Sequence, residues 1–159
     1  MEARTPDDVQ AALDALGLDI QVQHFETSTA TSQEAADSIG TSLGSIAKSL
    51  GFLVDGQPVV VIASGDQRVD DRKLGALHEV SRKKVKIANP DATVEATGYA
   101  PGGVPPVGHT NSLPIYIDQT LSRFELVYAA AGSPNAIFPI PYETLVDVTG
   151  GQVVDIAKE

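Results

Sequence analysis

The chain has 159 residues, of which 42% are hydrophobic and 20% are charged, and this is the size and balance of one globular domain. It contains no cysteine, which excludes a disulfide framework, a thiolate nucleophile and a Cys-ligated zinc ion. The three histidines are too far apart for local metal-ligand spacing, so neither a metal nor a cofactor is expected.

Targeting and membrane signals are not evident in the chain. No stretch approaches the roughly 18 consecutive apolar residues that a membrane-spanning helix needs. The first residues have neither the basic region nor the apolar run of a signal peptide. We therefore expect a single cytoplasmic domain over residues 1–159, without a membrane partner.

The charge is distributed unevenly. The net charge is −10, yet residues 66–89 carry seven of the eleven Lys and Arg residues and only four acidic residues. Such a stretch can contact a phosphate backbone, or it can be the solvated surface of an ordinary helix and strand. Its cations are Arg68, Arg72, Lys73, Arg82, Lys83, Lys84 and Lys86.

The first 40 residues predict two helices and a strand. Thr5 is a suitable N-cap before Pro6 and two acidic residues, which predicts a helix over about 6–16. Residues 20–25 alternate between apolar and polar side chains, as a half-buried strand does. Thr31-Ser32-Gln33-Glu34 is a capping box that opens a short helix ending at Gly40.

The rest of the chain mixes strands and helices irregularly. Ser42 is able to cap one more turn, and Asp55-Gly56-Gln57 separates two aliphatic runs as a hairpin does. The expected strands are 49–54, 58–63, 85–88, 113–117, 124–130 and 137–140. The expected helices are 70–77, 90–98 and 142–148. This order favours an α+β fold with a mixed sheet over a doubly wound parallel one.

Lys48 is the first candidate site residue, because it is the only cation between Arg4 and Arg68 and it enters an apolar run. If residues 48–54 form a strand, Lys48 shares a face with Leu50 and Phe52, so its ammonium group points toward the core or a pocket. If residues 43–50 instead form a helix, Lys48 lies on its solvated flank. Both geometries, and an ordinary solvated lysine, are compatible with the residues alone.

The second candidate is the loop over residues 98–111, which is rich in glycine and proline. Glycines allow a ligand to approach the backbone and leave N–H groups free, while prolines stiffen the path. Such a loop can form an oxyanion or phosphate cradle, or it can be purely structural. It matches neither a Gly-Lys-Ser/Thr phosphate loop nor a dinucleotide fingerprint.

No side-chain nucleophile is evident. His109 follows the glycine loop and can serve as an acid, a base or a hydrogen-bond donor near neutral pH, or simply as polar lining. The one Gly-x-Ser-x-Gly match, Gly40–Gly44, follows the helix expected to end at Gly40 and not a strand, so it is not the strand-to-helix elbow that activates a serine. Catalysis would therefore depend on positioning, on backbone N–H donors and on a water molecule or a ribose hydroxyl group.

Three segments together resemble a known family. They are Ile46–Phe52 around Lys48, Thr97–His109 with the Gly-x-x-x-Pro motif from Gly102 to Pro106, and the turn Ala130–Asn135. In order and spacing these segments resemble the YbaK family, which is related to the editing domain inserted in bacterial prolyl-tRNA synthetases. The resemblance covers roughly residues 5–157.

The resemblance implies an activity and a fold. Members hydrolyse, in trans, the ester that links a wrong amino acid to the terminal adenosine of a tRNA, often a tRNA for proline. The implied partners are the tRNA acceptor end and an aminoacyl-tRNA synthetase. The implied fold is a single α+β domain whose mixed, mainly antiparallel sheet is partly closed into a barrel, with helices packed around it and no metal.

The resemblance also implies site residues. Lys48 would hold the nucleotide or the aminoacyl group, and the backbone of Gly102 and Gly103 would lie near the scissile carbonyl. The residues implied for substrate binding are Thr27, Pro106, His109, Gly132, Ser133 and Asn135. The basic stretch over residues 66–89 would face the tRNA phosphates. Because no general base is evident, a non-catalytic binder of aminoacyl-tRNA or of a small nucleotide remains an alternative, as does a small-anion-binding domain.

Overall fold

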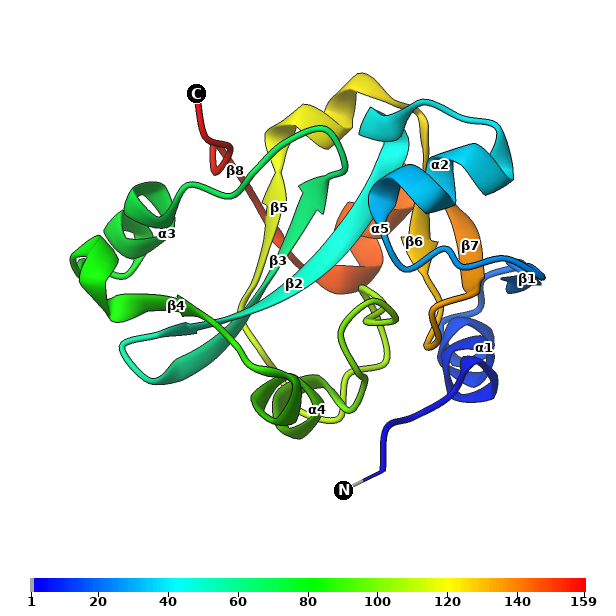
Figure 1. Cartoon of the computed structure of the whole chain (residues 1–159), viewed down its shortest axis with the longest axis horizontal. Helices are drawn as coiled ribbons and strands as arrows, with labels where there is room; N and C mark the ends of the chain where they lie inside the picture. Colours follow the sequence, from blue (N-terminus) through cyan, green and yellow to red (C-terminus); the bar gives the residue numbers. More distant parts are fainter. Residues whose placement is uncertain (1) are drawn as a thin grey trace.

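Residues 2–159 are described by a computed structural model, in which five α-helices surround one sheet of eight strands (Figure 1). The helices are α1 (Pro6–Ala15), α2 (Ser32–Ile39), α3 (Asp71–Leu77), α4 (Pro90–Thr97) and α5 (Tyr142–Thr149). The strands are β1 (Gln23–His24), β2 (Ile46–Val54), β3 (Gln57–Ser64), β4 (Val85–Ile87), β5 (Ile115–Asp118), β6 (Leu126–Ala130), β7 (Ala136–Pro141) and β8 (Gln152–Val154). Three 3-10 turns are η1 (Leu43–Ser45), η2 (Arg82–Lys84) and η3 (Gln119–Arg123). The expected α+β class is confirmed.

The sheet is mixed, as expected. Its strand order is β1-β7-β6-β2-β3-β5-β8, and β4 pairs with β2 beside this path. The pairs β1–β7, β6–β7, β2–β3 and β2–β4 are antiparallel, whereas β2–β6, β3–β5 and β5–β8 are parallel. Within residues 2–159 no pairing joins β1 to β8, so the sheet is open and its expected closure into a partial barrel is not confirmed.

The hairpin of β2 and β3 forms the centre of the sheet. Its register runs from Ala47 opposite Ser64 to Val54 opposite Gln57. The connecting residues Asp55 and Gly56 both have positive φ, of 50° and 82°, as a two-residue hairpin turn that follows the sheet twist requires. The Asp55-Gly56 signal in the sequence is thus confirmed.

One edge of β2 is shared by two strands. β6 pairs with β2 only at Ile46 and Ala47, and β4 pairs with it only from Phe52 onward. Between them, the stretch Lys48–Gly51 has no strand beside it on this edge, although the N–H of Ala88 donates to the Gly51 carbonyl. The sheet therefore has an opening next to Lys48.

The helix α2 begins at the predicted capping box. The N–H of Glu34 donates to Thr31 Oγ1 (3.1 Å), and the N–H of Thr31 donates to Glu34 Oε1 (3.2 Å). Gly40 ends the helix with a φ of 81°. These local bonds fix where the chain enters α2, directly beside the opening of the sheet (Figure 1).

Two expectations need correction. The strand expected over residues 20–25 is reduced to β1, because the side chain of Gln10 bonds the Ile20 carbonyl (2.9 Å) and the Val22 N–H (2.8 Å) and so replaces a strand partner. The helix considered over residues 43–50 is wrong: only η1 is helical there, and Lys48 lies in β2. The strand β8 was not expected.

Within residues 2–159 no helix has the length and apolar character needed to cross a bilayer.

The packing around Gly65 gives a stability test. An added Cβ at Gly65 would overlap the Leu43 carbonyl oxygen and lie 3.0 Å from Ser32 Cβ. We expect Gly65→Ala to lower the free energy of unfolding by about 1–3 kcal/mol through overpacking, as measured by urea denaturation. Gly51→Ala is the matched control, since its Cβ would meet Ala88 Cβ at an ordinary 3.5 Å. Equal stabilities of the two variants would contradict this packing.

Candidate active site

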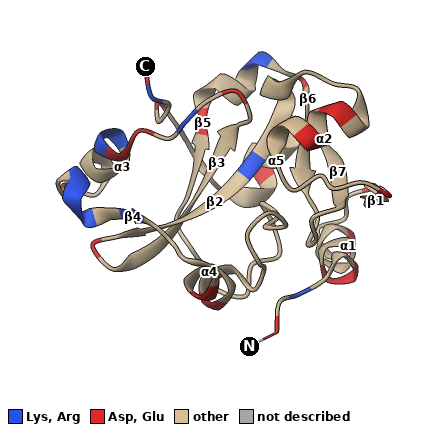
Figure 2. Cartoon of the chain, viewed as in Figure 1, with Lys and Arg blue, Asp and Glu red and all other residues tan. Residues whose placement is uncertain are grey.

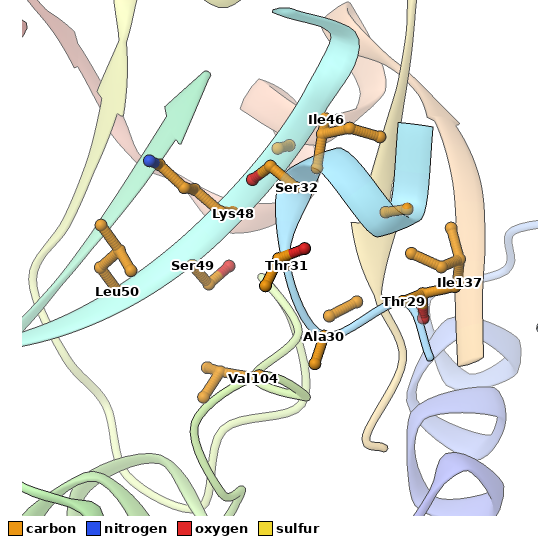
Figure 3. A pocket seen from close by; sticks show the side chains of 14 residues that line it. Thr29, Ala30, Thr31, Ser32, Ile46, Lys48, Ser49, Leu50, Val104 and Ile137 are labelled. Carbon is orange, nitrogen blue, oxygen red and sulfur yellow. The ribbon is translucent and has the colours of Figure 1, made fainter. Parts of the chain in front are cut away.

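A cavity of about 260 Å³ lies at the opening of the sheet (Figure 3). β2 contributes Lys48, Ser49 and Leu50, and the loop after α4 contributes Gly102 and Val104. The remaining lining residues come from the entry to α2 and from the inner strands, and they are Thr29, Ala30, Thr31, Ser32, Ala35, Ile46, Ala47, Ala130 and Ile137. The structure thus brings two of the three residues predicted as catalytic, Lys48 and Gly102, into one cavity.

Lys48 lies on the strand face predicted for a buried or pocket-facing lysine. On this face of β2, Ile46 packs in the cluster beneath α2, and Phe52 packs in the cluster that includes Leu74 of α3. Lys48 lies between these two apolar clusters and is half-buried. Partial burial, and then the charge of Arg68, lower the pKa of Lys48 below its ordinary 10.5, while Asp118 and Asp66 oppose this effect.

The ammonium group of Lys48 is available to a ligand. Within the described residues, the salt bridges join Lys73 to Asp155 and Glu159, and Arg123 to Asp66; none involves Lys48. A partly buried charge without a partner is unfavourable. An anionic or carbonyl oxygen in the cavity would supply the missing interaction.

A polar network that the sequence did not reveal supports the segment before Lys48. Arg123 of η3 donates through both terminal nitrogens to Asp66 (2.8 and 3.2 Å) and through one of them to Ser64 Oγ (2.9 Å). Ser64 Oγ in turn donates to the Gly44 carbonyl (2.6 Å) in η1, four residues before Lys48. The hydrogen bond from Arg123 holds the pKa of Asp66 at about 2, against an ordinary 3.8.

Within residues 2–159, Asp118 is the one carboxylate among the buried residues. It accepts from the N–H of Thr120 (3.0 Å), from Thr120 Oγ1 (2.8 Å) and from the N–H of Ser64 (3.4 Å). Hydrogen bonds of this kind stabilise a buried carboxylate. Asp118 opposes the lowering of the Lys48 pKa, and it does not line the cavity.

The glycine loop and the turn after β6 are locked together. An added Cβ at Gly103 would lie 2.8 Å from the Ser133 nitrogen and 2.9 Å from the Gly132 carbonyl carbon. The N–H of Gly132 donates to the Gly103 carbonyl (2.8 Å). Gly102, with a φ of 87°, is the residue that faces the cavity, whereas Gly103 forms the contact with the turn and is not a lining residue. The N–H of Gly103 is already donated to Ala100 (3.1 Å).

Pro106 and His109 lie elsewhere. They line a second cavity, of about 390 Å³, together with residues of α1 and the end of α5. His109 Nε2 donates to the Pro105 carbonyl (2.7 Å), which assigns the proton to that nitrogen. Burial lowers the pKa of His109. The structure therefore does not bring these two residues together with Lys48.

The other residues predicted for substrate binding surround the first cavity without lining it. Thr27 is exposed, with its hydroxyl 3.3 Å from that of Ser38. Ser133 Oγ donates to Asn135 Oδ1 (2.8 Å) within the turn, and Gly132 packs against the loop as described. The lining residues that sequence reasoning missed include Thr29 and Ser49, which follows Lys48 in the chain. Thr31 had been identified only as a helix cap.

The basic stretch divides into separate parts. Arg68 is close enough to Lys48 to influence its pKa. Lys73 is engaged with Asp155 (2.9 Å). The cations of η2 and β4 gather at the end of the molecule near α3, away from the cavity (Figure 2). Arg72 is exposed on α3.

The three segments that carry the resemblance to an editing domain of translation, around Lys48, Gly102 and Gly132, thus lie close together in the fold. The model of the aminoacyl-tRNA editing domain family matches residues 26–148. The chain belongs to this family.

Individual relatives agree with this assignment. The chain is 36% identical over 140 residues to YwhH of Bacillus subtilis, covering 87% of each chain. It is 27% identical over 130 residues to the "Putative Cys-tRNA(Pro)/Cys-tRNA(Cys) deacylase EbsC" of Enterococcus faecalis, covering 81% of this chain and 78% of that one. A crystal structure of "a putative trans-editing enzyme for prolyl tRNA synthetase" superposes with a TM-score of 0.91 at 36% identity over 100% of both chains. The proline–tRNA ligase of Shouchella clausii is 33% identical over 101 residues, which are 64% of this chain and 17% of the ligase.

The ion pair of Asp66 with Arg123 predicts a pH dependence of stability. The folded-state pKa of Asp66 is depressed from 3.8 to about 2, so the pair stabilises the fold above about pH 4 and this contribution is lost as the pH falls toward 2. We expect Asp66→Asn to be less stable than the wild type at pH 7, by no more than about 1 kcal/mol because the pair is partly exposed. Urea denaturation at pH 7 and near pH 2 measures this, and a difference that persists at the lower pH would contradict it.

Proposed function

We propose that this protein is an aminoacyl-tRNA deacylase, which hydrolyses in trans the ester between a wrong amino acid and the terminal adenosine of a tRNA, in the cytoplasm. The observation that carries this proposal is the cavity that Lys48 and Gly102 share. Family membership supports the reaction class. The names of EbsC and of the crystallised trans-editing enzyme support tRNA for proline as the substrate and prolyl-tRNA synthetase as the source of the mischarged tRNA.

The proposed mechanism depends on positioning. Lys48, as an ammonium group, holds the terminal nucleotide or the aminoacyl carbonyl in the cavity. Within residues 2–159 the N–H groups of Gly102 and Val104 have no hydrogen-bond partner, so they are available to the oxygen that becomes negative when the ester carbonyl is attacked. A water molecule attacks the carbonyl carbon, and the ribose oxygen of the ester leaves with a proton, which releases the free amino acid. If the neighbouring ribose hydroxyl attacks first, the acyl group only moves to that oxygen, and water must then hydrolyse the new ester.

A second function is favoured by one observation. The side chains that line the cavity include one cation and no carboxylate or imidazole group, so the described lining offers no general base. A protein with this cavity that binds aminoacyl-tRNA without hydrolysing it is the alternative. Turnover measurements distinguish the two functions.

We further propose that the tRNA acceptor stem extends from the cavity past Arg68 toward the cations of η2 and β4. Arg68 is exposed and lies near Lys48, and the more distant cations gather on one end of the molecule (Figure 2). With a net charge of −10, the rest of the chain repels phosphates. The binding is therefore expected to be weak and strongly dependent on salt.

The first functional prediction concerns Lys48. Purified protein should release the amino acid from at least one member of a panel of alanyl-, cysteinyl-, seryl- and threonyl-tRNA for proline. Lys48→Ala should lower the rate by about 100-fold or more, because it removes a preorganised charge at the reacting group. Lys158→Ala, at an exposed lysine, is the control and should retain full activity.

The outcomes separate the two functions. Release of no amino acid from the panel, with binding that Lys48→Ala abolishes, would identify a binder instead of an enzyme. Full activity of a correctly folded Lys48→Ala variant, verified by circular dichroism, would refute the role of the lysine.

The second functional prediction concerns the distant cations. The double variant Arg82→Glu/Lys84→Glu should raise KM for a complete charged tRNA and reduce the salt dependence of binding. Hydrolysis of a short charged fragment that contains only the terminal nucleotides should not change, because the fragment does not reach η2. An unchanged KM for the complete tRNA would show that the stem takes another path.

A further inference from the structure

Two buried hydroxyl groups have no hydrogen-bond partner within residues 2–159, and they are Ser49 Oγ and Tyr99 OH. Such groups are rare, because a buried polar atom without a partner destabilises the fold. Tyr99 does not line the cavity. Ser49 does, and Figure 3 shows that its side chain and that of Lys48 leave β2 in different directions. The unpartnered hydroxyl of Ser49 therefore belongs to the wall of the active-site cavity.

Of the three other hydroxyl residues of this wall, Ser32 is partly exposed, and Thr29 and Thr31 have protein partners. Thr29 Oγ1 donates to the Pro134 carbonyl (3.3 Å), and Thr31 Oγ1 accepts from the N–H of Glu34 (3.1 Å). Ser49 Oγ exposes less than 1 Å², so it is enclosed at the wall in its present rotamer. The serine side chain has three staggered positions, so a rotation about its Cα–Cβ bond is the only change needed to turn the hydroxyl toward the cavity.

The backbone places Ser49 at the centre of the opening in the sheet. The N–H of Ala88 donates to Gly51, and the N–H of Asp55 donates to Lys84, so odd-numbered residues of β2 turn their peptide groups toward the edge shared by β4 and β6. Ser49 and Gly51 are the odd-numbered residues between the ends of these two pairings, and the Gly51 carbonyl already accepts from Ala88. A ligand can thus approach the peptide group of Ser49 directly, and its hydroxyl after a change of the Ser49 rotamer.

The rest of the cavity wall suits a substrate whose aminoacyl group has a small side chain. Alanine contributes four of the lining positions, Ala30, Ala35, Ala47 and Ala130. The cavity volume of about 260 Å³ is below the roughly 300–1,000 Å³ of pockets for larger ligands. A small aminoacyl group with one hydrogen-bonding atom matches this combination of alanines and a free hydroxyl.

We propose that Ser49 is a specificity-determining residue that binds the side-chain hydroxyl of the aminoacyl group, so that the preferred substrate is a seryl-tRNA and not an alanyl-tRNA. Serine and alanine differ by that hydroxyl alone, which can both donate to and accept from Ser49. A site built to bond a substrate hydroxyl discriminates against the analogue that lacks it. Cysteine is also disfavoured, because its thiol is a weak donor and a weak acceptor. This inference rests on the proposed deacylase function.

The test compares the release of serine, cysteine and alanine from the same tRNA for proline, each charged separately. The wild type should release serine fastest. Ser49→Ala should lower the ratio of seryl to alanyl kcat/KM by roughly 2- to 12-fold, which is the effect of one neutral hydrogen bond. Ser49→Thr keeps a hydroxyl on a residue suited to strands and should retain the serine preference.

Ser81→Ala is the matched control, since Ser81 is exposed and its side chain makes no capping bond, and its ratio should equal that of the wild type. The proposal is overturned if the wild type releases alanine or cysteine at least as fast as serine, or if Ser49→Ala leaves the ratio unchanged. A protein that releases none of the three, and no threonine either, would contradict the deacylase function itself, and with it this inference. Release of alanine alone would contradict only the role of Ser49.

Discussion

The incomplete pairing of β2 is the constraint on which the site depends. β6 covers the beginning of this edge and β4 covers its end, and the two strands run in opposite directions relative to β2. A strand edge without a neighbour exposes peptide groups that elsewhere in a sheet are bonded. Here this opening is bordered by the entry to α2 and by the loop at Gly102. A ligand in the cavity can therefore use backbone atoms of a central strand, which is held rigidly by its other neighbour, β3.

The glycine loop is positioned by a segment nearly 30 residues further along the chain. Gly103 has no room for a Cβ against Ser133, and its carbonyl accepts from Gly132. The loop and the turn are one structural unit, in which Gly103 makes the contact and Gly102 faces the cavity. Because the loop needs the turn to hold it in place, the glycine loop and the Ala-Gly turn together indicate a site in the sequence. Neither a glycine-rich loop nor an Ala-Gly turn identifies a site by itself.

Local signals predicted the fold better than the site. The capping box at Thr31 and the Asp55-Gly56 turn are encoded by neighbouring residues, and both were confirmed. The environment of Lys48 was not predictable, because the same residues suit a strand or a helix and the choice depends on pairing with β3. Ser49 was missed because a serine carries no signal of burial until the neighbouring strands are known. His109 follows the predicted loop in sequence, yet the chain turns at Gly108 and takes it to another cavity.

Two carboxylates near Lys48 stabilise its positive charge without forming a salt bridge with its ammonium group. Asp118 is buried and already accepts three hydrogen bonds, and Asp66 directs its carboxylate to Arg123. Both carboxylates therefore oppose the lowering of the Lys48 pKa by desolvation. Neither of them forms a salt bridge with the lysine. A direct salt bridge would have to be broken for each substrate, at a cost to binding. The two carboxylates thus support the charge of the lysine and leave its hydrogen bonds free, as the proposed positioning role of Lys48 in a site without a general base requires.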